Sequence, residues 1–143
     1  MIKSKLVILV LFLSLLFLTL GCTGKEPIYT SNFFIINESS KSLDLRIYKN
    51  DSLEIHTINQ NLIYKKSIIQ GFSGFSEPFE DVDSLIIIFE DKKHISYTFK
   101  SPDKKQNILW LDAYDVQVIS DKTGDYVNNY TYRITEQDYL SAN

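Results

Sequence analysis

The chain is 143 residues long and 44% hydrophobic, with a formal net charge of −3 at pH 7. This length allows one domain with its own core but not comfortably two. The acidic balance argues against a nucleic-acid partner, which would need a concentrated basic face. The single cysteine excludes an internal disulfide, so burial and hydrogen bonding must stabilise the fold.

Residues 1–21 have the form of a secretory signal peptide. Lys3 and Lys5 precede fifteen mostly apolar residues, and the small residue Gly21 ends the segment. A bilayer-spanning helix needs roughly 20 apolar residues, so this run is short for one. We expect 1–21 to be removed, which leaves 122 residues and shifts the formal charge from −3 to −5. An uncleaved anchor is the alternative.

Cys22 is the only cysteine and stands where this cleavage would occur. Residues 18–22, Leu-Thr-Leu-Gly-Cys, resemble the bacterial lipoprotein signal, in which the peptidase cuts before a cysteine whose sulfur and new amino group become acylated. Thr19 and Leu20 depart from the residues that this pattern prefers, whereas Gly21 fits it. The resemblance implies lipidation of Cys22 by two or three acyl chains, which would make membrane attachment stable. A plain signal peptide with a coincidental cysteine is the alternative.

The mature chain is predicted to begin with a tether and to continue as one domain. Residues 22–32 are polar and show no period, which is typical of a short tether, here a lipidated one. We expect a single domain over 33–143, in which nearly every apolar segment has strand character. The predicted strands lie at 33–36, 43–47, 53–58, 62–69, 84–90, 94–100, 108–111, 114–120 and 126–134.

Two hairpins and a central strand are the clearest of these elements. Residues 43–47 and 53–58 alternate with period 2 on either side of a turn cluster. The segment 84–90 is β-branched and apolar on both faces, which predicts a central strand in a sheet covered on both sides. The polar turn 91–93 joins it to the alternating segment 94–100, so these two should form the second hairpin.

The overall pattern predicts an all-β fold. Many short strands at close spacing, with no long helix between them, indicate an antiparallel β-sandwich, immunoglobulin-like or related. A small β-barrel is the alternative, because local alternation does not reveal how the sheet edges meet. Gly124 suits a hairpin turn, and Thr135 with Asp138 fits a helix start, so we expect a short C-terminal helix.

Four segments follow the signal in a characteristic order: Phe-Ile-Ile-Asn-Glu-Ser-Ser at 34–40, the strand and turn at 83–93, Asn-Ile-Leu at 107–109 and the closing segment 130–139. In this order the chain resembles the small uncharacterised lipoproteins of Bacteroidota-type bacteria. The resemblance implies an outer-membrane anchor and supplies no catalytic residues. In such bacteria a lysine and acidic residues after the lipidated cysteine mark export to the outer face. Lys25 and Glu26 are a weak version of that mark, so the periplasmic and surface faces both stay open.

Four carboxylates lie within seven residues: Glu77, Glu80, Asp81 and Asp83. Such oxygens are the ligands that calcium prefers, but the spacing lacks the D-x-D-x-D-G loop. A glycosidase would need two of them at a defined separation across a cleft. We interpret the segment as a solvated acidic loop and predict no metal, no cofactor and no enzymatic role. His56 and His94 are interpreted as solvated surface residues, because nothing near them has metal-site spacing.

The loop 71–79 combines two glycines with Phe72, Phe75 and Phe79. Exposed aromatic side chains on a loop can anchor a partner, since they bury a large area with few rotamers to order. The alternative is that these rings cap the core. Trp110 faces the same choice. A stacking surface for sugars, or equally a sheet-packing surface, is predicted on the alternating face of Tyr126, Tyr130 and Tyr132.

These patterns favour an exported lipoprotein, anchored to the bacterial outer membrane, that acts as a non-catalytic binding or scaffolding module. Its partner would be an envelope protein or glycan. One alternative is an inhibitor or immunity-type lipoprotein that blocks an arriving enzyme through the 72–79 loop. A hydrolase that uses the carboxylates between 77 and 83 is the least favoured hypothesis, because the sequence assembles no catalytic constellation.

Overall fold

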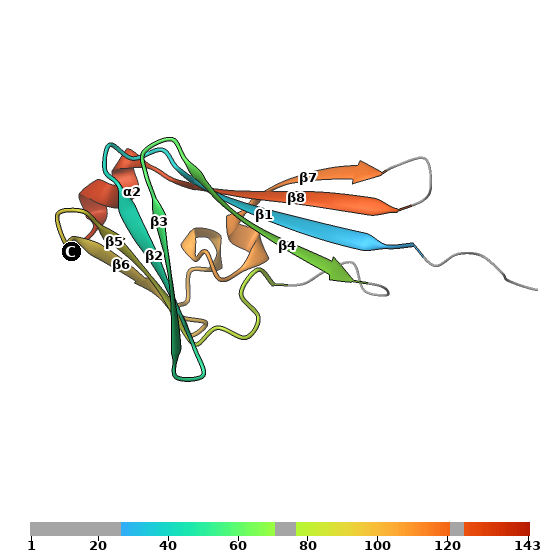
Figure 1. The fold of residues 1–143 in the computed structure, drawn as a ribbon, viewed down its shortest axis with the longest axis horizontal. Helices are drawn as coiled ribbons and strands as arrows, with labels where there is room; N and C mark the ends of the chain where they lie inside the picture. Colours follow the sequence, from blue (N-terminus) through green and yellow to red (C-terminus); the bar gives the residue numbers. More distant parts are fainter. Residues whose placement is uncertain (1–26, 71–76, 121–124) are drawn as a thin grey trace, which may run out of the picture.

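The computed structural model describes residues 27–70, 77–120 and 125–143, and Figure 1 shows their arrangement. The strands are β1 (Tyr29–Asn37), β2 (Leu43–Lys49), β3 (Ser52–Ile58), β4 (Ile63–Gln70), β5 (Ser84–Phe89), β6 (His94–Tyr97), β7 (Asp115–Ser120) and β8 (Tyr126–Ile134). Between β6 and β7 lie the 3₁₀ helices η1 (Lys104–Gln106) and η2 (Leu111–Ala113), and α2 (Glu136–Ser141) follows β8. The predicted lipidation site Cys22 and the predicted turn residue Gly124 lie outside the described residues.

The strands form two sheets, which confirms the predicted all-β sandwich. Sheet A has the strand order β4-β1-β8-β7, and sheet B has the order β3-β2-β5-β6. Within the described ranges these are two separate sheets rather than one closed sheet. Neighbouring strands are antiparallel except β1 and β8, which run parallel from Tyr29 opposite Tyr126 to Asn37 opposite Ile134. Alternation along a strand carries no information on the direction of its neighbour, so this pair could not be predicted.

Sheet A extends beyond sheet B at the end where β1 begins (Figure 1). β1 and β8 have nine residues each, whereas β5 has six and β6 has four. β1 starts at Tyr29, before the domain boundary predicted at residue 33, because its first residues pair with both β4 and β8. Tyr29 also stacks on Tyr126, with ring centroids 5.1 Å apart. The tether predicted over 22–32 is therefore shorter than expected, and we call this end of sheet A the projecting end.

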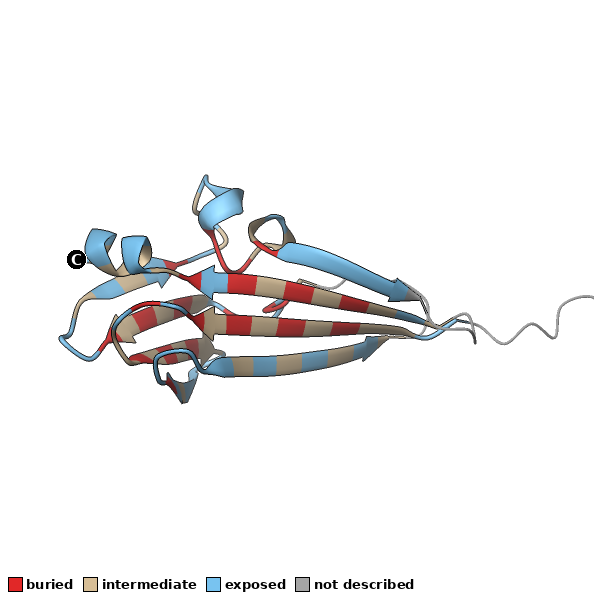
Figure 2. Cartoon of the chain, turned by 90° about the horizontal axis from the view of Figure 1, so that it is seen from above, coloured by how far each residue is buried: buried red, intermediate tan, exposed pale blue. Residues whose placement is uncertain are grey.

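Alternate side chains of both sheets form the core, as the burial colours along the strands in Figure 2 show. In β5, Leu85, Ile87 and Phe89 are buried, and β5 lies between β2 and β6, as predicted for a central strand. Ile86 and Ile88 on its other face are only half-buried. The prediction that this sheet is covered on both sides is wrong, because the described chain places no second layer over this face.

The segment 108–111 is not a strand, contrary to the prediction from its apolar residues. Ile108 and Leu109 are fully buried, but they lie between η1 and η2 rather than in a sheet. Asn107 shapes this connection: its amide donates to the Thr98 carbonyl (2.8 Å), and its side-chain oxygen accepts from the Leu109 N–H (3.1 Å). Irregular backbone can be buried only when its polar groups find such partners.

The predicted C-terminal helix is confirmed as α2. Thr135 and Asp138 form a capping box, in which the Thr135 N–H donates to the Asp138 carboxylate at 2.7 Å. Tyr139 packs edge-on against Phe89, with ring centroids 5.2 Å apart, and so joins α2 to sheet B. In the part of the chain that the structure describes, no helix is long and apolar enough to cross a membrane.

Asn37 joins the end of β1 to two neighbouring segments. Its side chain is fully buried, and its amide donates to the carbonyls of Lys41 (2.8 Å) and Ile58 (2.9 Å). Its side-chain oxygen accepts from the N–H (3.1 Å) and the hydroxyl (2.7 Å) of Ser39. A buried amide in this position holds both sheets at the end opposite the projecting end.

We expect Asn37→Ala to lower the free energy of unfolding by about 2 to 4 kcal/mol, because it leaves several buried polar groups without partners. Urea unfolding followed by tyrosine and tryptophan fluorescence measures this change. The control is Asn59→Ala at an exposed position in the β3–β4 connection, which should cost less than about 0.5 kcal/mol. Equal losses for the two variants would contradict the role of Asn37.

Candidate functional site

Sheet B presents a partly apolar face to the outside of the sandwich. We call it the sheet B outer face, and it comprises Asp44, Arg46, Tyr48, Leu53, Ile55, Thr57, Ile86 and Ile88. Leu53 is 46% exposed and Ile55 is 51% exposed, and Ile86 and Ile88 are half-buried. Among the described residues no further layer packs on this apolar face, which makes it a candidate surface for a partner.

The β2–β3 turn explains why the apolar side chains of β3 lie outside. Asn50 and Asp51 both have positive φ (44° and 63°), which suits a two-residue hairpin turn. The resulting register places Ile55 opposite Arg46 on the outer side, and His56 opposite the buried Leu45. His56 therefore lies on the core side of its strand, and its side chain, which was predicted to be solvated, is 38% exposed.

His56 lies at the inner edge of sheet B. Its ring centroid is 4.5 Å from that of Tyr64, and its Nε2 is 3.6 Å from the Glu54 carboxylate. Within the described ranges Nε2 is buried and has no hydrogen-bond partner. The other histidine, His94, is exposed, as predicted.

Arg46 occupies the middle of the sheet B outer face. Its direct neighbours across the strands are Ile55 and Ile86. Its Nη2 lies 3.9 Å from the Asp44 carboxylate, which also accepts a hydrogen bond from the Thr57 hydroxyl at 2.8 Å. In the described part of the chain, Arg46 Nε is buried without a hydrogen-bond partner. An arginine set among aliphatic side chains has the composition of an interface hot spot.

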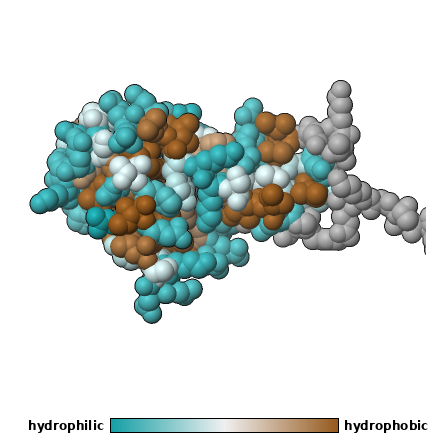
Figure 3. Space-filling view, in the orientation of Figure 1, coloured by the Kyte–Doolittle hydropathy of each residue, from teal (hydrophilic) through white to brown (hydrophobic). Residues whose placement is uncertain are grey.

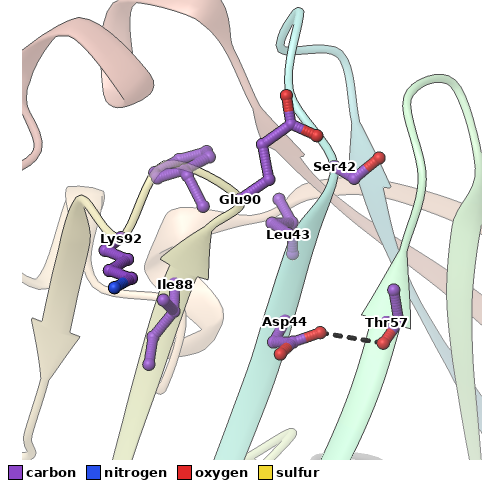
Figure 4. A pocket seen from close by; sticks show the side chains of 8 residues that line it. Ser42, Leu43, Asp44, Thr57, Ile88, Glu90 and Lys92 are labelled. Carbon is purple, nitrogen blue, oxygen red and sulfur yellow. Dashed lines mark hydrogen bonds between the residues drawn. The ribbon is translucent and has the colours of Figure 1, made fainter.

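A hollow of about 310 Å³ lies at one end of this face (Figure 4). Asp44 and Thr57 face each other across its floor, joined by their hydrogen bond, and Ile88 lies on the β5 side. Glu90 at the rim is 3.2 Å from the Lys41 ammonium. Asp44, Thr57 and Glu90 thus already have polar partners, and the hollow can receive a side chain or a small group from a partner.

The predicted carboxylate cluster does not converge on one point. Glu77 accepts from the Leu111 N–H (2.9 Å), and burial raises the pKa of its carboxyl group. Asp81 pairs with Lys49 at 2.8 Å, which lowers the Asp81 pKa, and Asp83 accepts from the Asn50 N–H (2.9 Å). Within the described ranges, no group of three or more His, Cys, Asp or Glu side chains is placed to hold a metal ion.

Glu77, Glu80 and Asp81 do share one cleft of about 350 Å³ between the sheets. Lys66 from β4 also lines it, and burial lowers the pKa of the Lys66 ammonium. The Lys66 Nζ lies 5.0 Å from the ring centroid of Phe79, which is a cation–π contact. The cleft therefore lies between the two sheets and is lined by both carboxylates and the Lys66 ammonium.

The predicted aromatic anchors differ in where they lie and in how far they are buried. Phe79 is 1% exposed and lies in the core, as the alternative interpretation expected. Phe72 and Phe75 lie outside the described residues. Trp110 is half-buried: its ring packs edge-on against Phe99 (5.2 Å between centroids), and the Lys104 Nζ lies 4.2 Å from its ring centroid. A partner-binding role for Trp110 stays a prediction.

The tyrosine face of β8 is mainly a packing surface. Tyr130 and Tyr132 are buried, and Tyr130 stacks on Phe33 with centroids 4.9 Å apart. The Tyr132 hydroxyl lies 3.3 Å from the Tyr97 hydroxyl, and the Tyr114 hydroxyl donates to a backbone carbonyl at 2.7 Å. These rings point into the core, so they are not available for stacking on a sugar.

Comparisons with known proteins leave the function open. No protein-family model matches the chain, and no curated protein matches it. A similar solved structure is the NMR structure of a protein from Eubacterium rectale. It is 17% identical, the match covers 76% of this chain and 91% of that chain, and the TM-score is 0.28. A likeness at this level carries no argument about function.

The buried tyrosines predict a loss of stability at high pH. Burial raises the pKa values of Tyr97, Tyr114 and Tyr132 in the folded state. Unfolded tyrosines ionise near about pH 10, so stability is kept below that pH and falls above it by up to about 1.4 kcal/mol per pH unit for each such tyrosine. Urea unfolding between neutral and alkaline pH, with tyrosinate absorbance, measures this.

Tyr114→Phe should make the alkaline loss shallower, because it removes one buried ionising group. Tyr126→Phe is the matched control, since Tyr126 is 37% exposed, and it should leave the slope unchanged. If the folded protein ionised all its tyrosines near pH 10 with no loss of stability, the assignment of these three as buried would be wrong.

Proposed function

We propose that this protein is a lipid-anchored lipoprotein of the bacterial outer membrane that binds a partner protein of the envelope through the sheet B outer face. The observation that carries the proposal is the uncovered aliphatic surface around Arg46, with Leu53 46% exposed and Ile55 51% exposed. Arginine and tyrosine, here Arg46 and Tyr48, are among the residue types enriched at interface hot spots.

The position of the chain's first strand supports the anchored arrangement. β1 begins at the projecting end, whereas sheet B and α2 lie at the opposite end of the molecule (Figure 1). The seven residues from Cys22 to Ile28 reach at most about 25 Å when fully extended. A lipid on Cys22 would therefore hold the projecting end near the bilayer and present sheet B away from it.

The side chains on the sheet B outer face favour a protein over a glycan. Half of its eight residues are branched aliphatic, and Tyr48 is the single aromatic residue among the eight. Aliphatic side chains interdigitate with the apolar side chains of another protein, and the neighbouring Asp44 and Thr57 supply a polar rim. Sugar binding would instead require exposed aromatic rings for stacking, and the predicted candidates Tyr130 and Tyr132 are buried.

The two other hypotheses draw less support. The inhibitor hypothesis depends on the 72–79 loop, in which Phe79 is buried and Phe72 and Phe75 lie outside the described residues. The hydrolase hypothesis depends on carboxylates that already form structural contacts: one pairs with Lys49, and two accept hydrogen bonds from the backbone N–H groups of Asn50 and Leu111. Both stay predictions.

Photo-crosslinking in living cells tests the proposed surface. A photoreactive amino acid at Ile55 of the full chain should give one dominant adduct with an envelope protein, which mass spectrometry identifies. The matched control position is Ile63, which is 55% exposed but lies on sheet A. We expect no such adduct from Ile63, because sheet A is not the binding surface.

Arginine substitutions make this test specific. Arg46→Ala should weaken the partner's binding by about tenfold or more, as expected for a hot-spot residue, and should reduce the Ile55 adduct. Arg133→Ala, which removes an exposed arginine paired with Glu38 on sheet A, should leave the adduct unchanged. Equal adducts from Ile55 and Ile63, or an Ile55 adduct insensitive to Arg46→Ala, would contradict the proposal.

A further inference from the structure

We infer that the projecting end of sheet A rests in the headgroup region of the membrane that holds the anchor. This inference rests on the proposed lipid at Cys22 and adds a second, non-covalent contact with the lipid surface. It concerns a group of exposed apolar side chains that we call the tip patch: Ile28, Ile69, Val118, Ile119 and Tyr126.

Strand pairing brings the tip patch together. Thr30 lies opposite both Ile69 of β4 and Val127 of β8, and Val127 lies opposite Ile119 of β7. These residues form one row across the outer face of sheet A at its projecting end. Ile69 is 73% exposed and Ile119 is 45% exposed. Figure 3 shows apolar side chains over this end of the molecule.

The patch covers both faces of the sheet end. Val118 neighbours Ile119 in β7 and so points to the opposite face, where it is 63% exposed. Tyr126 lies on that face too, and its ring stacks on Tyr29. A partner protein docked on one face would leave the other uncovered, whereas a lipid surface can receive the end of the sheet and both of its faces at once. The geometry thus fits a membrane better than a one-sided interface.

The tether leaves the domain at this same place. The Ile28 N–H donates to the Asp125 carboxylate at 2.9 Å, and the Tyr126 N–H donates to the Ile28 carbonyl at 2.9 Å. These two bonds fix Ile28 beside the start of β8. Cys22 is at most about 25 Å from Ile28 along the chain. A lipid on Cys22 would therefore hold the tip patch near the bilayer, so that a second contact with the membrane costs little further translational entropy.

A polar row limits how deep the end can enter. Asn32 donates to Asn129 (3.0 Å), and the Ser67 hydroxyl donates to Asn32 (2.7 Å). This row is two residues beyond Thr30, which is about 7 Å along a strand. Interfacial protein segments bury their apolar side chains about 5 to 10 Å into the headgroup boundary, and stacked tyrosines suit that layer. The depth of the tip patch therefore matches a headgroup contact rather than a spanning one.

Site-specific fluorescence on the full, processed protein in vesicles tests the inference. Cys22 is the only cysteine, and acylation would block its thiol, so Ile69→Cys and Val118→Cys each add one free thiol for an environment-sensitive fluorophore. The matched control is Leu140→Cys in α2, which is 60% exposed at the opposite end. The vesicles contain phospholipids with a spin-label quencher just below the headgroups. The mass of the protein's N-terminal peptide reports whether Cys22 carries acyl chains.

We expect the labels at Ile69 and Val118 to shift to the blue and to lose fluorescence to the quencher, while the label at Leu140 does neither. Acylated protein that stays on the vesicles but shows no more quenching at Ile69 and Val118 than at Leu140 would overturn the membrane contact and leave the proposed anchor intact. An N-terminal peptide without acyl chains would overturn the proposed anchor, and the inference with it.

Discussion

The parallel pairing of β1 with β8 is the constraint on which the rest of the structure depends. The two strands pair over nine residues in the middle of sheet A, with β4 and β7 on either side. Because these strands are longer than those of sheet B, sheet A must extend past the sandwich at one end. The same pairing places the start of β1, the first strand of the described residues, at that projecting end.

Two surfaces follow from this asymmetry. The core side of each sheet is filled by alternate residues, such as Leu45 and Ile87, so apolar residues of the opposite parity lie outside. On sheet B they gather around Arg46. At the projecting end, where sheet A extends past the sandwich, apolar residues of both parities are exposed and form the tip patch. In our proposal one surface faces a partner protein and the other faces lipid, and the length of sheet A separates them.

Local features of the fold were predictable from the sequence, whereas pairing was not. The β2–β3 and β5–β6 hairpins and the Thr135 cap depend on neighbouring residues and are confirmed. The strand predicted over 108–111 is wrong because an apolar run reports burial, and Asn107 lets irregular backbone be buried there. The sheet B outer face was missed because the period-2 alternation of residues 53–58 does not by itself show which side of the strand faces the core. Asn50 and Asp51 form the two-residue turn before Ser52, and this turn sets the β2–β3 register that places Leu53 and Ile55 on the outer face.

The central claim is that a lipid on Cys22 holds the projecting end at the membrane. Metabolic labelling with an acyl-chain analogue, on the native protein and on Cys22→Ala, tests it most directly. We expect label on the native protein alone, with the native protein in the outer-membrane fraction. Absence of label from both, or equal label on both, would contradict the account, because the tether would then have no lipid at Cys22.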